Sequence, residues 1–114
     1  MKVIHFNEAE SYEPETGWKR SSLCNEAVIS VEHFIKPPKH SSPLHKHPNC
    51  QVLIVLKGSL AIISKDGYEI IVGEGDAVYI PKHEFHVVKN ILDEPSIGID
   101  IFVPGRSFDF WLKK

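Results

Sequence analysis

The sequence has few of the features that mark secreted, membrane-spanning or nucleic-acid-binding proteins. Only two cysteines, Cys24 and Cys50, occur in 114 residues, too few for a disulfide framework, so a reducing, cytoplasmic location is expected. No apolar run approaches the roughly 18 residues that a membrane span requires, and the N-terminus lacks the pattern of a signal peptide. The formal net charge of -2 provides no basic surface for nucleic acid. We therefore expect a small cytoplasmic domain that binds neither nucleic acid nor membrane.

Helix signals are also nearly absent. Short runs rich in β-branched and aromatic residues alternate with Gly, Pro and Asp at intervals of roughly ten residues, which is typical of an all-β sandwich or barrel. Strands are predicted at residues 3–6, 27–35, 51–56, 60–64, 68–72, 77–80, 85–89 and 97–103. With 42% hydrophobic residues, the chain has material for one core and a single domain.

The polar stretch of residues 7–22 contains Pro14 and Gly17 and shows no strand pattern. Residues 1–22 are therefore predicted to form an N-terminal arm and loop, and residues 23–114 the barrel. The strand predicted at 51–56 is apolar on both faces, so both faces need cover. Because so short a chain has little material for a second layer, we expect a homodimer in which the partner subunit covers the outer face.

Three histidines and a glutamine have the spacing of metal ligands. His45, His47 and Gln51 all occupy odd positions, so on one extended segment their side chains point to the same side. His86 follows about forty residues later, in another predicted strand, and completes the set from across the barrel. The alternative is that these histidines are ordinary side chains of a barrel without metal. That ordinary interpretation is preferred for the remaining histidines: His5, His33, His40 and His83.

This spacing resembles the two sequence motifs of the cupin family. Residues 45–58 resemble the first, H-x-H-x3-E-x6-G, and residues 75–90 the second, G-x5-P-x-G-x2-H-x3-N. The family also has a glycine six residues before the first histidine, where this chain has Lys39. His83 replaces the second glycine of the second motif, and Gln51 replaces the glutamate ligand. The resemblance implies a cupin barrel, a double-stranded β-helix or jelly roll, with one metal ion bound by four residues: His45, His47, Gln51 and His86.

The glutamine bears on the kind of metal chemistry. Three neutral imidazoles and a neutral amide leave the charge of the ion uncompensated, which favours a divalent ion acting as a Lewis acid over one that cycles through Fe(III). Nickel, zinc, manganese and iron are the candidates, because imidazole suits several transition metals and cellular availability decides among them.

The last predicted strand carries a carboxylate, Asp100, between Ile99 and Ile101. Such a group is costly against apolar core, so we expect it to face a polar cavity that contains the metal. Arg106 follows just beyond the strand, and its planar guanidinium suits a substrate carboxylate. The alternative is a structural Asp100–Arg106 ion pair.

The ligand set, together with Asp100, Phe102 and Arg106, resembles the KdgF group of cupins. This resemblance implies that Asp100 and Arg106 are catalytic and that Phe102 and Arg106 bind the substrate. In that group, a cyclic 4,5-unsaturated monouronate is converted into its linear keto form. A metal-dependent enzyme acting on an acidic sugar is thus expected. Two alternatives stay open: a barrel that binds a sugar acid or other small molecule without turnover, and an iron-dependent dioxygenase.

Overall fold

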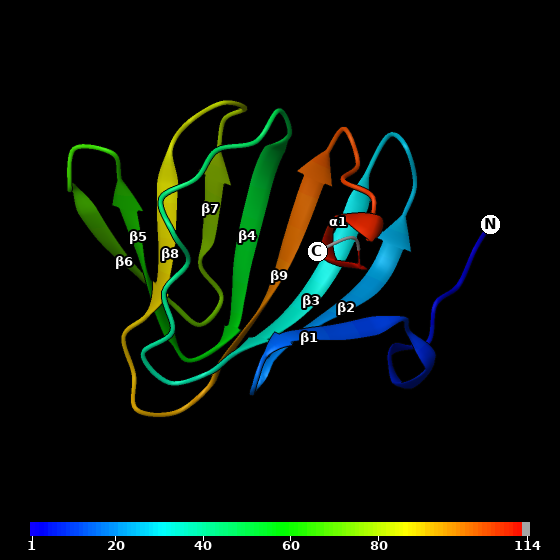
Figure 1. The fold of residues 1–114 in the computed structure, drawn as a ribbon, viewed down its shortest axis with the longest axis horizontal. Coiled ribbons are helices and arrows are strands. Elements are labelled where there is room, and N and C mark those ends of the chain that lie inside the picture. Colours follow the sequence, from blue (N-terminus) through cyan, green and yellow to red (C-terminus); the bar gives the residue numbers. More distant parts are fainter. Residues whose placement is uncertain (113–114) are drawn as a thin grey trace.

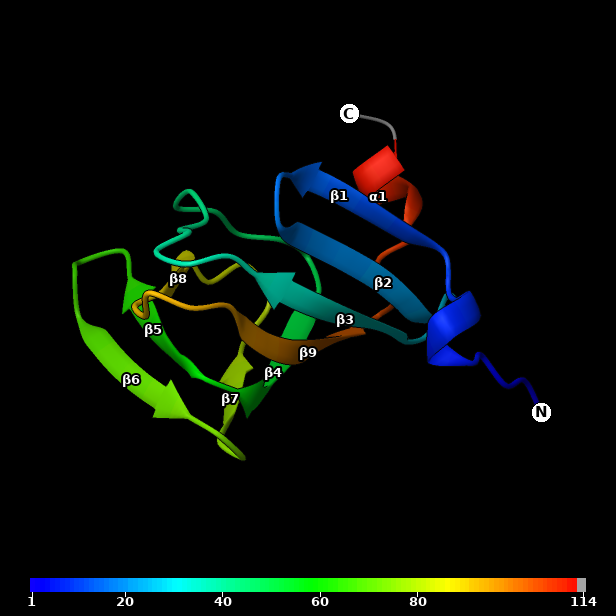
Figure 2. The same ribbon diagram turned by 90° about the horizontal axis from the view of Figure 1, so that it is seen from below.

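A computed structural model describes residues 1–112 as two facing antiparallel sheets (Figures 1 and 2). The larger sheet has the strand order β1-β2-β3-β9-β4-β7 and the smaller β6-β5-β8. The elements in chain order are the 3-10 helix η1 (Phe6–Glu8), β1 (Ser11–Glu15), β2 (Trp18–Asn25), β3 (Ser30–Lys36), β4 (Cys50–Lys57), β5 (Ser59–Ser64), β6 (Glu69–Gly73), β7 (Ala77–Ile80), β8 (His86–Asn90), β9 (Ser96–Val103) and α1 (Asp109–Leu112). The all-β prediction is confirmed, and every strand predicted from residue 27 onward is present.

The N-terminal predictions were wrong. Residues 3–6 form no strand, and η1 begins at Phe6. The segment predicted as a loop contains β1 and most of β2, which pair with each other and extend the larger sheet beyond β3. The boundary drawn at residue 22 thus falls inside β2. The polar composition of β2 gave no strand pattern because its buried residues include Arg20 and Ser21, and the carboxylates that pair with Arg20 lie on other strands.

The two positions that depart from the cupin glycines adopt the backbone that glycine favours. Lys39 has a φ of 60° and His83 a φ of 65°, a left-handed conformation that costs a non-glycine residue about 1–2 kcal/mol. Tertiary hydrogen bonds hold both turns, because the Lys39 N–H donates to the Leu92 carbonyl at 3.1 Å and the His83 N–H to the His47 carbonyl at 2.8 Å. The turn geometry is therefore kept although glycine is not.

The apolar core lies between the two sheets. It consists of Phe34, Leu53, Val55, Leu60, Val72 and Val88. Phe34, Leu53 and Val88 also line a cavity, so the apolar core forms one boundary of the candidate site. In the described residues, no helix has the length and apolar character to cross a bilayer.

Candidate metal centre and cavity

Three histidines meet at one point of the barrel. His45 and His47 lie in the segment between β3 and β4, and His86 is the first residue of β8. The backbones of His45 and His86 hydrogen-bond to each other in both directions, at 3.1 and 2.9 Å. One potential ligand atom from each of the three histidines lies within 4.8 Å of the others.

The path of the chain between these candidate ligands differs from the expected single extended segment. His45 forms an isolated bridge with His86, and a bend at Pro48 and Asn49 precedes β4, in which Gln51 is the second residue. The Asn49 side chain fastens this bend by donating to the Pro104 carbonyl at 2.7 Å. The side chains lie close together because the chain bends at Pro48 and Asn49, and not because one extended segment carries them, as the period-two argument assumed.

Backbone contacts set the tautomer of each imidazole. The Nδ1 atoms lie 2.8–2.9 Å from backbone carbonyl oxygens of Pro43, Asn49 and Glu84, for His45, His47 and His86 respectively. A carbonyl only accepts, so each Nδ1 carries a proton, and in the neutral form of each ring Nε2 presents a lone pair. Burial lowers the pKa of His86 to about 4 and also lowers the pKa of His45. Both rings are therefore neutral near pH 7, as metal ligands must be.

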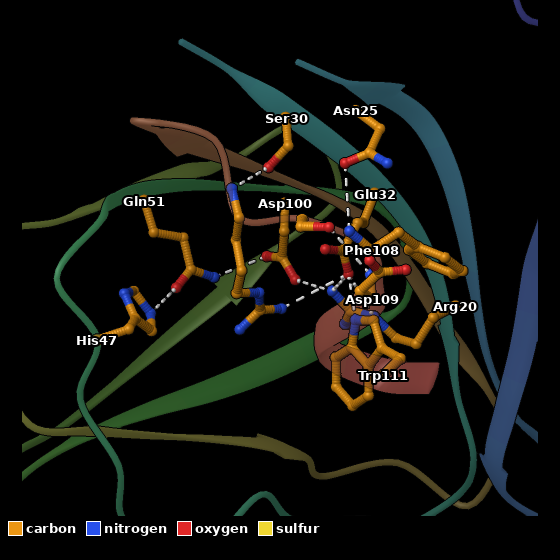
Figure 3. Close-up of polar contacts among 12 residues, drawn as sticks. Arg20, Asn25, Ser30, Glu32, His47, Gln51, Asp100, Phe108, Asp109 and Trp111 are labelled. Carbon is orange, nitrogen blue, oxygen red and sulfur yellow. Dashed lines mark hydrogen bonds and ion pairs between the residues drawn. The ribbon is translucent and has the colours of Figure 1, made fainter. Parts of the chain in front are cut away.

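Gln51 continues this arrangement. Its amide nitrogen donates to Asp100 Oδ1 at 2.8 Å, which directs its Oε1 toward His47 Nε2, 3.0 Å away (Figure 3). When the His47 ring is neutral, with its proton on Nδ1, its Nε2 and Gln51 Oε1 are both acceptors, an arrangement that a cation bound to both atoms would stabilise. His86 Nε2 is buried without a hydrogen-bond partner among the described residues. The donor set and this unpartnered nitrogen both fit a divalent transition metal.

Asp100 links this centre to a buried ion-pair network. Its Oδ2 accepts from Arg20 at 2.9 Å, and the same guanidinium donates to Glu32 Oε1 at 2.6 Å (Figure 3). The Trp111 indole also donates to Glu32 Oε1, at 2.7 Å. Burial alone would lower the pKa of Arg20, but Asp100 and Glu32 together raise it above its ordinary value. Asp100 lines the cavity, as the sequence predicted.

Arg106 lies between aromatic rings. Its guanidinium carbon is 4.1 Å from the ring centre of Phe102 and 4.2 Å from that of Phe110. A guanidinium nitrogen of Arg106 lies 3.5 Å from Glu32 Oε1, and burial lowers the pKa of Arg106. The alternative of an Asp100–Arg106 ion pair is not found among the described residues, since Asp100 pairs with Arg20 instead. Phe102 and Arg106 both line the cavity, where the sequence analysis expected them.

The cavity has a volume of about 230 Å³. Its lining comprises Trp18, Arg20, Phe34, Lys36, Ser42, Pro43, His45, Lys46, His47, Gln51, Leu53, His86, Val88, Asp100, Phe102, Arg106, Phe110 and Trp111. The site predicted from the sequence did not include Trp18, Arg20, Lys36 and Trp111 in the cavity lining, or Glu32 behind it. The alternation of Glu32, Phe34 and Lys36 along β3, all buried, was an available signal, because the reasoning applied to Asp100 holds for them as well.

The fold and this site define a β-barrel with a histidine-lined metal centre facing its cavity. The family model of the Cupin_2 cupin domain matches residues 32–102, and the chain belongs to this family. It is also 33% identical over 104 residues to the oxalate decarboxylase OxdC of Bacillus subtilis (strain 168), an alignment that covers 87% of this chain and 26% of that protein. The aligned region is therefore about a quarter of that relative's length.

Solved structures agree with this assignment. An RmlC-like cupin from Shewanella frigidimarina superposes with a TM-score of 0.84 at 24% identity, covering 96% of each chain. KdgF from a Halomonas species superposes with a TM-score of 0.84 at 21% identity, covering 96% of this chain and 98% of that one. At these identities, the similarity establishes the shared cupin barrel.

Proposed function

We propose that this cupin is a metal-dependent enzyme that converts a cyclic, unsaturated acidic sugar, a uronate, into its linear keto form. The observation that carries the proposal is the direct contact between Asp100 and Gln51, which places a cavity carboxylate one hydrogen bond from a candidate metal ligand. The structural similarity to KdgF and the sequence resemblance to its group support the choice of substrate class. The metal would be held by His45, His47, Gln51 and His86.

In this proposal, Asp100 moves the proton. A divalent ion in the site would polarise a ring or hydroxyl oxygen of the sugar. Each Asp100 oxygen accepts one protein hydrogen bond, from Gln51 or from Arg20, and each retains a further lone pair. Those bonds hold the carboxylate in place at the cavity wall, so it can accept or return the proton that opening of the enol ether and hemiacetal requires.

Phe102 and Arg106 would orient the sugar. Phe102 is 1% exposed, and its ring stands edge-on to His47, with the ring centres 5.4 Å apart, so it forms a rigid apolar wall beside the metal site. Arg106 is clamped between Phe102 and Phe110, which restricts its guanidinium to one orientation and lowers the cost of ordering it around a bound oxygen.

The test is an ultraviolet assay for loss of the conjugated C=C signal of an unsaturated uronate. Replacing Asp100→Asn keeps the shape of the side chain and removes the base, so we expect turnover to fall by about 10²-fold to 10⁴-fold with the metal content unchanged. Asp109→Asn, at an exposed carboxylate of α1, serves as the control and should keep full activity.

Other outcomes distinguish the alternatives. Full activity in Asp100→Asn would contradict its role in proton transfer. Stoichiometric binding of the sugar acid by the wild type without turnover would indicate a binding module. Oxygen consumption that depends on Fe(II) would favour the dioxygenase.

We also propose that the chain forms the homodimer expected from its sequence. Support comes from the outer face of β4 and β9, where Ile54 pairs with Ile99 and Val52 with Ile101, all four only partly buried in the monomer. Light scattering should give twice the mass of one chain, and Ile99→Lys should yield monomers because a charge cannot be buried in an apolar interface without a partner. A monomeric wild type at high protein concentration would contradict the proposal.

A further inference from the structure

Lys36 is a buried cation of the cavity whose charge has no partner. It is the last residue of β3, is 3% exposed and lines the cavity. Among the described residues, its ammonium forms no ion pair and no hydrogen bond, and its contact is with the ring of Trp18, whose centre lies 5.0 Å from Nζ. Burying an unpaired ammonium costs folding free energy, so this lysine weakens the folded state.

The two arginines that line the cavity, the buried Arg20 and the partly buried Arg106, are offset by carboxylates. The guanidinium groups of Arg20 and Arg106 lie within ion-pair distance of Glu32, and Arg20 also pairs with Asp100. This group of two cations and two anions has no net formal charge. Among the described cations that line the cavity, Lys36 and Lys46 have no carboxylate within ion-pair distance, and of these two only Lys36 is buried.

Trp18 adds a second donor beside this ammonium. Its indole Nε1 is buried without a hydrogen-bond partner among the described residues, and the residue lines the cavity. The ring is held by His40, at a centroid distance of 4.4 Å, and His40 is in turn bound to Glu15 at 2.8 Å. Two unsatisfied donors on neighbouring strands, one of them charged, suit an anionic oxygen acceptor.

We infer that Lys36, assisted by the Trp18 indole N–H, binds the carboxylate of the acidic sugar and sets the preference for an acid over a neutral sugar. This inference rests on the proposed function for its substrate class. It moves the carboxylate from Arg106, where the sequence analysis had placed it, because Glu32 already offsets the Arg106 charge. Arg106 is left to contact other oxygens of the ligand.

The experiment compares the binding of galacturonate and galactose to the purified, metal-loaded protein by calorimetry at pH 7. We expect the wild type to prefer galacturonate at least tenfold. Lys36→Met should remove most of that preference and leave galactose binding unchanged, Lys36→Arg should retain it, and Trp18→Phe should reduce it severalfold. Lys46→Met is the matched control, because Lys46 also lines the cavity but is exposed, and it should change the preference less than twofold.

Two further measurements separate binding from a structural role. Lys36→Met should raise the thermal unfolding midpoint, since it removes a buried unpaired charge. If Lys36 instead stabilises the fold, the same substitution should lower the midpoint.

The second measurement is the pH dependence of binding. Burial, and to a smaller extent the charge of Arg20, lowers the pKa of Lys36 to about 8, although the negative charges of Asp100 and Glu15 oppose this shift. Galacturonate affinity should therefore fall as the pH rises through about 8 in the wild type. The Lys36→Arg variant should keep its affinity for galacturonate across this pH range, because a guanidinium stays charged. A loss of affinity in this variant too would instead indicate titration of another group near Lys36: Glu15 on β1, Arg20 on β2 or Asp100 on β9.

An unchanged galacturonate preference in Lys36→Met, or no preference in the wild type, would overturn the inference. The proposed function fails separately. A protein that prefers galacturonate through Lys36 but does not turn over an unsaturated uronate would retain the inference and lose the reaction. A protein that turns over the uronate, but whose preference for galacturonate over galactose does not depend on Lys36, would retain the proposed function and lose the inference.

Discussion

Replacement of His86 with alanine is expected to abolish stoichiometric metal binding. His86 contributes a buried Nε2 without another partner among the described residues, and it is one of the three imidazoles whose candidate ligand atoms lie within 4.8 Å of one another. Removing one of three histidine ligands should cost more than the roughly 10-fold to 100-fold loss in affinity that follows the loss of a supporting hydrogen bond. The metal content after dialysis, measured by elemental analysis, should fall from about one ion per chain in the wild type to nearly none in the variant.

The control for this prediction is His83→Ala, three positions away in an exposed turn, which should keep its metal. Retention of a full equivalent by His86→Ala would contradict the ligand assignment. Acid should release the ion, because protons compete for the imidazole nitrogens. Since burial lowers the pKa of His86 to about 4, this competition at His86 is shifted below the pH of about 6.5 at which a free imidazole is half protonated.

Replacement of Arg20 with methionine is expected to lower the free energy of unfolding by about 3–5 kcal/mol, the usual cost of removing one partner from a buried ion pair. Arg20 is 5% exposed, and the carboxylates that it bridges, Glu32 and Asp100, are 1% and 5% exposed. Methionine fills part of the volume, but it leaves Asp100 without the cation that it pairs with, and it leaves Glu32 with the longer, 3.5 Å contact to Arg106. Urea denaturation of the variant and the wild type measures the difference.

The matched control is Lys2→Met, which breaks the exposed ion pair with Glu26 and should leave the denaturation midpoint unchanged, as is usual for surface pairs. If Arg20→Met shifts the denaturation midpoint as little as Lys2→Met does, the buried network does not stabilise the fold. We also expect Arg20→Met to reduce turnover, because Arg20 helps to hold Asp100 in the position from which Asp100 orients Gln51.

The network explains why the site could be predicted only in part. Alternating apolar residues predicted the strands from β3 to β9, and the two motifs grouped His45, His47, Gln51 and His86. Asp100 stood out because it interrupts a run of isoleucines. Arg20 gave no such signal, because it lies in a polar stretch without alternating apolar residues. The strands of this stretch, β1 and β2, lie at one edge of the larger sheet, where β2 pairs with β3.

The sequence by itself determined the all-β fold and the expectation of a carboxylate in the cavity, because side-chain alternation is a short-range property. The cupin barrel and the grouping of His86 with the other candidate ligands came from the resemblance of the two motifs to those of the family. Only the tertiary structure decided the charge partners. Arg20 and Asp100 are 80 positions apart in sequence, and they meet because the sheet order places β3 between β2 and β9. The same order leaves Lys36 buried without a carboxylate. Electrostatic pairing depends on distance through space, and strand order sets that distance.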